Sequence, residues 1–205
     1  MKSISYNVNG IRAAETKGLS SWLLEQNADL IALQETKAFE HQFDWSPFLE
    51  AGYCLYTESA IKPGYSGVAV LSRQEPLGVV HGVGESWIDQ EGRVLRVDFK
   101  DFSFMSVYMP SGSSGEERQA YKMKFLEFFG PYAQSLALQL PALVVAGDYN
   151  ICHQAIDIHD PVGNAKSSGF LPEERAWFDG FLERGFVDPY RNLHPERVGD
   201  RKSVV

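Results

Sequence analysis

Cysteine and long apolar runs are both scarce in this sequence. Its two cysteines, Cys54 and Cys152, lie far apart and fit no metal-ligand spacing, so we expect ordinary buried thiols. No run of about 18 apolar residues occurs, and residues 1–8 do not resemble a secretion signal. These absences argue against a membrane-spanning helix and predict a cytoplasmic protein.

Positive charge is also in short supply. The sequence has 19 Lys and Arg residues against 27 Asp and Glu residues, which gives a formal net charge of -8. A protein that binds nucleic acid by electrostatics alone needs a basic face, so this balance argues against that class. Two possibilities remain: acidic residues gather where metal ions reverse the local field, or basic residues are concentrated on one surface.

What is present suits a folded enzyme. The 205 residues include 44% hydrophobic and 13% aromatic side chains, enough to bury a substantial core. The sequence shows no internal repeat, no low-complexity tract and no linker. We therefore predict a single domain spanning residues 1–205, with a long and functional loop at residues 160–169.

The apolar pattern predicts an α/β fold. Short runs rich in β-branched residues predict strands, and apolar residues at i, i+3 and i+4 predict helices between some of them. The expected strands are residues 3–8, 30–33, 68–71, 94–99, 104–109 and 143–146. The expected helices are residues 16–26, residues 116–138 and a third that begins at Pro172.

Polar residues stand where four of these strands end. They are Asn7, Glu35, Tyr108 and the pair Asp148 and Asn150. If the strands are neighbours in a sheet, their ends share one edge, where loops can build a site on a rigid base. A single strand-end Asp or Asn is more often a turn residue or a helix cap. Five together are harder to explain in that way.

The chemistry of these side chains suits a hard cation and a phosphate. Mg²⁺ prefers oxygen ligands and commonly takes only one or two protein carboxylates, a description that Glu35 and Asp148 fit. Asp148 follows Gly147, which allows a close approach. Asn150 can donate a hydrogen bond to a phosphoryl oxygen as charge grows in a transition state.

Six sequence blocks resemble, in order, the signature blocks of the exonuclease III and abasic-site endonuclease family. The resemblance covers essentially the whole chain. The blocks are Asn-Val-Asn-Gly-Ile-Arg (7–12), Leu-Gln-Glu-Thr-Lys (33–37), Gly-Tyr-Ser-Gly-Val-Ala (64–69), Glu-Gly-Arg (91–93), Gly-Asp-Tyr-Asn-Ile (147–151) and Ser-Gly-Phe-Leu-Pro-Glu-Glu-Arg (168–175).

The resemblance implies a DNase I-like α/β fold, a two-sheet sandwich flanked by helices in four layers. It implies that Glu35, with Asn7 beside it, binds Mg²⁺ or Mn²⁺. Asp148 and Asn150 are implied to be further metal ligands, to orient or deprotonate the attacking water and to hold the scissile phosphate. Tyr108 is implied to contact the phosphate. The resulting activity is hydrolysis of DNA 5′ to an abasic site, with 3′-to-5′ exonuclease or 3′-phosphatase activity as further options.

The resemblance also implies a partner, double-stranded DNA with abasic sites or 3′ ends, which a monomer binds. Tyr65, Ser66 and Asn164 fall in loops that contact the DNA backbone in the family, although an ordinary surface-loop role remains open for Tyr65 and Asn164. Phe170 is a candidate for shaping the pocket of an extruded abasic sugar. Basic residues near the motifs can provide phosphate contacts, although any one of them alone is more often a solvated charge: Arg12, Lys37, Arg73, Arg93 and Lys166.

The resemblance stops short of the family's full length. The family continues beyond the point where this sequence stops, at Val205, through further strands and a Ser-Asp-His block. We therefore expect the final strands of the sandwich to be missing, together with an Asp and a His that act in catalysis. Two alternatives follow: a catalytically impaired remnant that binds DNA, or a phosphodiesterase of the same superfamily that acts on phospholipids.

Overall fold

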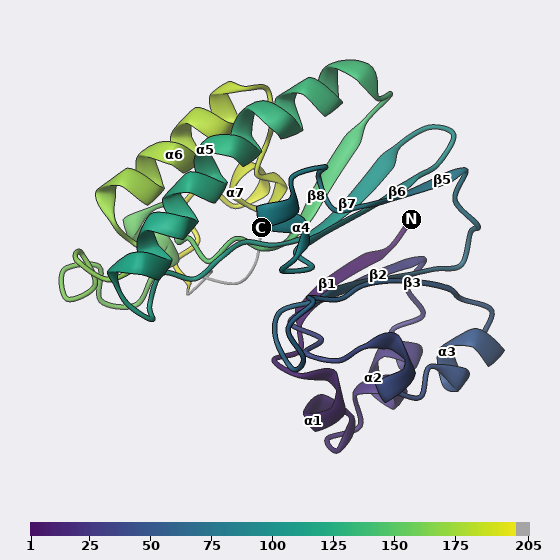
Figure 1. The fold of residues 1–205 in the computed structure, drawn as a ribbon. Helices are drawn as coiled ribbons and strands as arrows, with labels where there is room; N and C mark the ends of the chain where they lie inside the picture. The colour runs from purple at the N-terminus through teal and green to yellow at the C-terminus, as the bar shows by residue number, and fades with distance from the viewer. Residues whose placement is uncertain (200–205) are drawn as a thin grey trace. The chain divides into compact units, whose positions relative to one another are not determined.

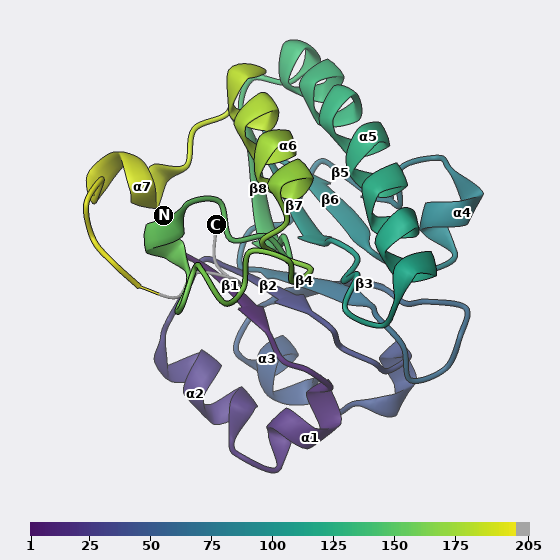
Figure 2. The same cartoon turned by 90° about the vertical axis from the view of Figure 1, so that its left-hand side faces the viewer.

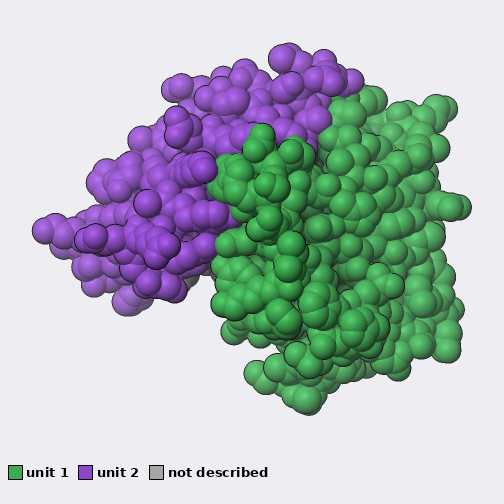
Figure 3. Space-filling view, in the orientation of Figure 1, with its two compact units in different colours: residues 1–108, 140–147 green, residues 109–139, 148–205 purple. Residues whose placement is uncertain are grey.

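The computed structural model describes residues 1–199, and the chain forms two compact units (Figure 3). Unit 1 comprises residues 1–108 and 140–147, and unit 2 comprises residues 109–139 and the chain from residue 148 onward. The prediction of a single domain stays a prediction. The last six residues lie outside the described part of the chain.

The first sheet of unit 1 is mixed. It contains β1 (Ser3–Asn7), β2 (Leu30–Gln34), β3 (Cys54–Glu58) and β4 (Val68–Ser72), in the order β1-β2-β4-β3. β1 and β2 are parallel, and β4 is antiparallel to both β2 and β3. The parallel pair brings the carboxyl ends of β1 and β2 to the same edge.

The second sheet has the order β5-β6-β7-β8. Its strands are β5 (Gly78–His81), β6 (Val94–Asp98), β7 (Ser103–Tyr108) and β8 (Leu143–Asp148). β6 is antiparallel to both β5 and β7. The N–H group at the start of β7 donates to the carbonyl of Ala142 just before β8, at 2.7 Å, as expected for strands that run in the same direction.

The core of unit 1 lies on both faces of the first sheet. β2 is buried along its whole length, which explains its continuous apolar run. Leu30 and Ala32 pack toward the second sheet, whereas Ile31 and Leu33 pack against the helical side. That side is covered by α1 (Ile11–Glu15), α2 (Leu19–Glu25) and α3 (Ser46–Glu50) (Figure 1).

Unit 2 contains α5 (Glu116–Gln139), α6 (Pro172–Glu183) and α7 (Pro189–Leu193). α5 and α6 lie side by side in both views (Figures 1 and 2), and the indole N–H of Trp177 on α6 donates to the carbonyl of Leu126 on α5 at 2.7 Å. The loop predicted at residues 160–169 has no helix or strand and is confirmed as a loop.

The two mixed sheets and their helices confirm the predicted α/β sandwich class. The six predicted strands are present, as are the helices that begin at Glu116 and Pro172. The helix predicted at residues 16–26 is present as α2, but it begins only at Leu19, because Gly18 adopts φ +82° and separates α1 from α2. The sequence analysis also missed the strands β3 and β5 and the short α4 (Ser86–Asp89). In residues 1–199, no helix combines the length and hydropathy needed to cross a bilayer.

Candidate active site

Asn7 and Glu35 meet at the carboxyl edge of β1 and β2. Asn7 pairs with Gln34 across the parallel ladder, and Glu35 is the next residue. The Nδ2 atom of Asn7 donates to Oε1 of Glu35 at 2.7 Å, and its Oδ1 accepts the backbone N–H of Asn9 at 2.9 Å. Asn7 therefore orients the carboxylate of Glu35, and the edge predicted from the strand ends is formed.

Glu35 is held in its ionised form. Burial acts to raise the pKa of Glu35, but hydrogen bonds from Asn7, Lys37 and Tyr108, with the charge of Lys37, outweigh it and lower the pKa below its ordinary value. The ammonium of Lys37 lies 2.8 Å from Oε2 of Glu35 and 2.5 Å from Oδ1 of Asn9. Lys37, predicted to contact DNA, is thus engaged within the protein.

The loops at this edge are strained. Glu35, Lys37 and Ser66 have φ values of +54°, +50° and +47°, in a region that non-glycine residues rarely adopt. The strain is maintained by interlocking backbone bonds, because the N–H of Lys37 donates to the carbonyl of Ser66 at 2.8 Å. Such conformations cluster at functional sites, which supports a site here.

A buried arginine contacts two tyrosines of unit 1 that are predicted to act in the site, Tyr65 and Tyr108. Arg93 lies with its Nε atom 2.6 Å from Glu91, donates to the backbone carbonyl of Tyr108 at 3.0 Å, and donates to the hydroxyl of Tyr65 at 3.1 Å. Its guanidinium also lies over the ring of Tyr108, at 4.7 Å from the centroid. Because Arg93 is only 2% exposed, its interpretation as a phosphate contact is wrong.

Unit 2 carries the second group of predicted site residues. Asp148 is 4% exposed and accepts the backbone N–H of Asn150 on its Oδ1 atom at 2.9 Å. The Nδ2 atom of Asn150 donates to the carbonyl of Met109, also at 2.9 Å. Along the chain, Met109 directly follows Tyr108 and Asp148 directly follows Gly147, so two of the three crossings between the units lie at predicted site residues.

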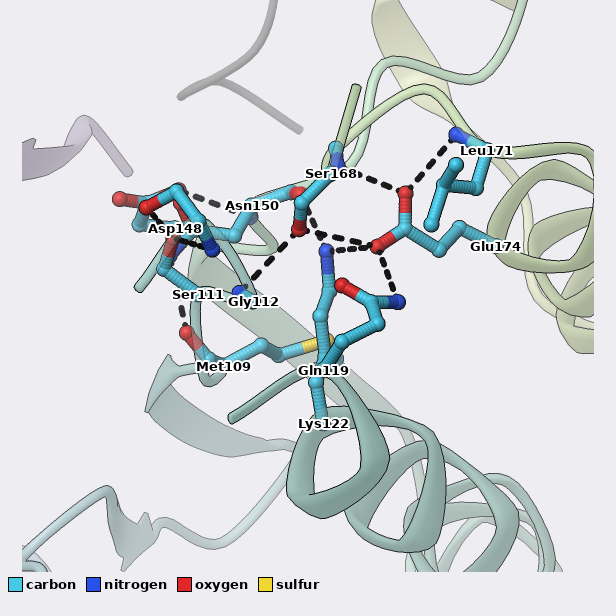
Figure 4. A network of polar contacts seen from close by, with 12 residues as sticks. Met109, Ser111, Gly112, Gln119, Lys122, Asp148, Asn150, Ser168, Leu171 and Glu174 are labelled. Carbon is cyan, nitrogen blue, oxygen red and sulfur yellow. Dashed lines mark hydrogen bonds and ion pairs between the residues drawn. The ribbon is translucent and has the colours of Figure 1, made fainter. Parts of the chain in front are cut away.

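Sequence reasoning missed a buried ion pair in unit 2. Lys122 and Glu174 have fully buried side chains, and their Nζ and Oε1 atoms lie 2.6 Å apart (Figure 4). One sequence signal could have revealed the pair. Lys122 continues the apolar stripe that Phe125, Leu126 and Phe129 form on α5, where a lysine needs a buried partner.

The remaining predicted DNA contacts differ in their surroundings. Arg12 is exposed on α1, and Ser66 is buried with an Oγ atom that has no hydrogen-bond partner among residues 1–199. The amide of Asn164 donates to the carbonyls of His159 and Asp160 at 2.9 and 3.0 Å, within its own loop. Phe170 is only 3% exposed. The DNA-contacting roles of these residues stay predictions.

The donor set, made of carboxylate and amide oxygens, fits a hard divalent cation such as Mg²⁺ or Mn²⁺. Within the described residues, no group of three or more His, Cys, Asp or Glu side chains could enclose a metal ion. Glu35 offers an ionised carboxylate, and Mg²⁺ commonly binds through one or two carboxylates while water and phosphate supply its other ligands. Of the four predicted ligands, Asn7 and Glu35 belong to unit 1 and Asp148 and Asn150 to unit 2.

Residues 4–199 match the family described as "Endonuclease/Exonuclease/phosphatase family". The chain belongs to this family. Among its relatives, the exodeoxyribonuclease of Bacillus subtilis is 44% identical over 97% of this chain and 78% of its own length. The DNA repair nuclease APEX1 of Danio rerio is 40% identical over 97% of this chain, which spans 64% of that relative.

Solved structures of the family agree with the fold. An AP endonuclease from Archaeoglobus fulgidus superposes with a TM-score of 0.85 at 30% identity, covering 95% of this chain and 75% of that one. A 3′-5′ exonuclease from Neisseria meningitidis superposes with a TM-score of 0.88 at 25% identity, covering 97% of this chain and 77% of that one. The predicted family and fold are therefore confirmed.

Proposed function

We propose that this chain is a divalent-metal-dependent DNA phosphodiesterase that cuts 5′ to abasic sites and acts as a monomer. The observation that carries the proposal is the ionised carboxylate of Glu35, which Asn7 and Lys37 hold at the carboxyl edge of a parallel strand pair. Its relatives at 44% and 40% identity are named as an exodeoxyribonuclease and a DNA repair nuclease. Removal of 3′-terminal nucleotides or phosphates is the same chemistry at a DNA end.

Each side chain has a role that its surroundings support. Glu35, oriented by Asn7, would hold Mg²⁺ or Mn²⁺, and Asp148 and Asn150 complete the proposed ligand set. When bound, the cation neutralises charge on the phosphate and on the leaving oxygen. Tyr108, whose backbone carbonyl and ring contact Arg93 and whose side chain bonds to Glu35, would contact the phosphate beside the cation.

The reaction is an addition of water across one phosphodiester bond. Asp148 accepts a proton from the attacking water while a new bond forms between that oxygen and phosphorus. The bond from phosphorus to the 3′ oxygen breaks, and this oxygen leaves with a proton as a 3′ hydroxyl. One N–H of the Asn150 side-chain amide is bound to the carbonyl of Met109. The second N–H donates to a phosphoryl oxygen as negative charge grows on that oxygen.

The names of the relatives favour DNA over a phospholipid substrate. The two blocks that distinguish the DNA branch in the sequence lie at residues 7–12 and 168–175. The first contributes Asn7, and the second contributes Glu174, which is bound to Lys122 beside Asn150. The first block therefore contacts the proposed metal ligand Glu35 directly, and the second block is linked to Asn150 through Lys122.

The proposal is tested on a duplex oligonucleotide with one abasic site. We expect Mg²⁺-dependent incision 5′ to that site and no incision in EDTA. Asp148→Ala should lower the rate by about 10²–10⁴-fold, the usual contribution of a positioned proton acceptor. Glu35→Ala should lower it at least about 100-fold, because the cation loses its carboxylate. Asp101→Ala, which removes an exposed carboxylate in the turn between β6 and β7, should leave the rate unchanged.

Three outcomes would contradict the proposal. Undiminished incision by Asp148→Ala would refute the role of that residue. Binding of the abasic duplex without incision, in Mg²⁺ and in Mn²⁺, would refute the activity and favour the DNA-binding remnant. Turnover of a phosphoinositide or sphingomyelin without turnover of DNA would favour the phospholipid alternative.

A further inference from the structure

The ion pair between Lys122 and Glu174 is costly to bury. Both side chains are fully inaccessible, and each charge must be removed from water to reach this position. A matched pair of apolar residues often replaces such a pair without loss of stability, so stability alone does not account for it. Its other contacts indicate what it does.

Glu174 fixes the start of α6 and the loop before it. Its Oε2 atom accepts the backbone N–H groups of Gly169 at 2.7 Å and Leu171 at 3.0 Å. Its Oε1 atom accepts the side-chain amide of Gln119 on α5 at 3.0 Å, in addition to the ammonium of Lys122. Glu174 therefore has a defined position that does not depend on Lys122 alone.

Lys122 connects Glu174 to Asn150. Its ammonium donates to the backbone carbonyl of Asn150 at 2.8 Å while it contacts Glu174 (Figure 4). In Figure 4 the lysine extends from α5 to a point between Glu174 and Asn150, so one cation bridges the helix pair and the segment after β8. The contact is to the backbone and thus fixes the peptide plane that follows Asn150.

Asn150 needs this restraint because its backbone is strained. Its φ of +51° lies in the left-handed region, from which a non-glycine residue relaxes unless its surroundings prevent it. Three contacts prevent it: the backbone N–H bonds to Asp148, the side-chain amide bonds to Met109, and the carbonyl bonds to Lys122. Of these, only the contact to Lys122 links Asn150 to the helices.

We propose that Lys122 and Glu174 are positioning residues, which hold the Asn150 side chain in the orientation needed for catalysis. This inference rests on the proposed function of Asn150 in phosphodiester cleavage. Lys122 acts at the backbone of Asn150 and does not contact the substrate. Its loss should therefore lower kcat while KM stays nearly constant, because the amide of Asn150 matters most in the transition state.

The test removes both charges together. Lys122→Met alone would leave Glu174 as an uncompensated buried charge, so Lys122→Met with Glu174→Gln is the informative variant. The Gln oxygen can still accept from Gly169 and Leu171. We expect a urea midpoint close to that of the wild type, a kcat at least tenfold lower on an abasic duplex, and a KM within twofold. Arg184→Met, which removes a 2.8 Å contact from Arg184 to Gln134 on α5, should change neither constant.

A double-mutant cycle shows whether the pair acts through Asn150. Asn150→Gly removes the side chain and tolerates the left-handed backbone. If the pair only positions that side chain, its removal in the Asn150→Gly background should cause less than a twofold further loss. A full tenfold loss in that background, or an unchanged kcat in the folded charge-removal variant, would overturn the proposal.

Amide hydrogen exchange separates this inference from the proposed function. In the wild-type chain, the N–H of Asn150 should exchange at least about 100-fold more slowly than an unprotected amide, because Asp148 accepts it in a fixed geometry. In the charge-removal variant this protection should fall at least tenfold, with β2 unaffected. If the N–H of Asn150 exchanged without protection in the wild-type chain, the positioning role would be overturned. If the expected protection pattern were found but the chain did not cleave abasic DNA, only the proposed activity would be refuted.

Discussion

The guanidinium of Arg93 is enclosed by groups that sequence alone could not assign to it. It bonds to Glu91, to the carbonyl of Tyr108 and to the hydroxyl of Tyr65, which lies 28 residues away in the sequence. A guanidinium holds five donors in one fixed plane, whereas an ammonium has three donors on a flexible stem and cannot reproduce that planar arrangement. Arg93 therefore maintains the geometry of two tyrosines that are predicted to meet the substrate.

Arg93→Lys tests this arrangement, because lysine keeps the positive charge but lacks the planar guanidinium and its fixed donors. We expect the free energy of unfolding to fall by about 1–3 kcal/mol, because buried acceptors lose their donors. Urea denaturation measures the change. Arg12→Lys is the matched control, since Arg12 is exposed, and it should shift the free energy by less than about 0.5 kcal/mol. If the two substitutions changed the free energy of unfolding equally, the guanidinium geometry of Arg93 would not contribute to stability.

At the scale of elements, the strand ends were the most reliable signal in the sequence. A short apolar run that stops at a polar residue predicts both the strand and the position of that residue at a sheet edge. This was enough to place Asn7 and Glu35 together, because β1 and β2 are parallel neighbours. The residues predicted to act at β7 and β8 also lie at the carboxyl ends of those strands.

Other elements could not be predicted because their local pattern is weak. β3 is half-buried along its length and lies at the edge of its sheet, so neither alternation nor a continuous apolar run identifies it. β5 is short, begins with Gly78 and is also an edge strand. Edge strands make fewer contacts and carry a less distinct pattern.

The contacts that complete the site depend on long-range packing. Lys122 and Glu174 are 52 residues apart, and the left-handed conformations of Glu35, Lys37 and Asn150 are stabilised by surrounding hydrogen bonds. Intrinsic preferences disfavour those conformations in non-glycine residues. Sequence patterns therefore predict which residues form the site, and the structure shows which contacts hold each of them.

Gly147 limits how closely β7 and β8 can approach. It has φ +154°, and a Cβ atom at this position would lie 1.8 Å from the carbonyl oxygen of Val107. Gly147→Ala must therefore displace the strand just before Asp148, and we expect the free energy of unfolding to fall by about 1–3 kcal/mol. Cleavage of abasic DNA should fall with it, because Asp148 moves with the strand.

A second glycine provides the control for this substitution. Gly180 lies within α6, and a Cβ atom there would have no neighbour within 4 Å. Gly180→Ala should raise the free energy of unfolding by about 0.5–1 kcal/mol, since alanine favours the helix. Thermal or urea denaturation of both variants gives the comparison. If Gly147→Ala were as stable as the wild type, the close approach of the two strands would not constrain this position.

For the whole molecule, the net charge of -8 must be reconciled with a polyanionic substrate. The basic residues of the site do not supply a strong positive surface, because Lys37 is bound to Glu35 and Arg93 to Glu91. We expect affinity for DNA to depend on a few of the exposed cations, among them Arg12, and on a metal ion when one is bound. Such binding would differ from that of proteins that hold DNA on a broad basic face.

The salt dependence of DNA binding tests this view. Each phosphate neutralised adds about -0.9 to the slope of log K against log salt concentration, so a few contacts predict a slope of about -2 to -4. The measurement is binding of an abasic duplex in EDTA, where we expect no cleavage.

Arg12→Ala should reduce the magnitude of the slope by about 1, as expected for the loss of one phosphate contact. Lys100→Ala, in the exposed turn between β6 and β7, should leave it unchanged. A slope steeper than about -6 would reveal a broad basic surface, and equal slopes for the two variants would exclude Arg12 as a phosphate contact.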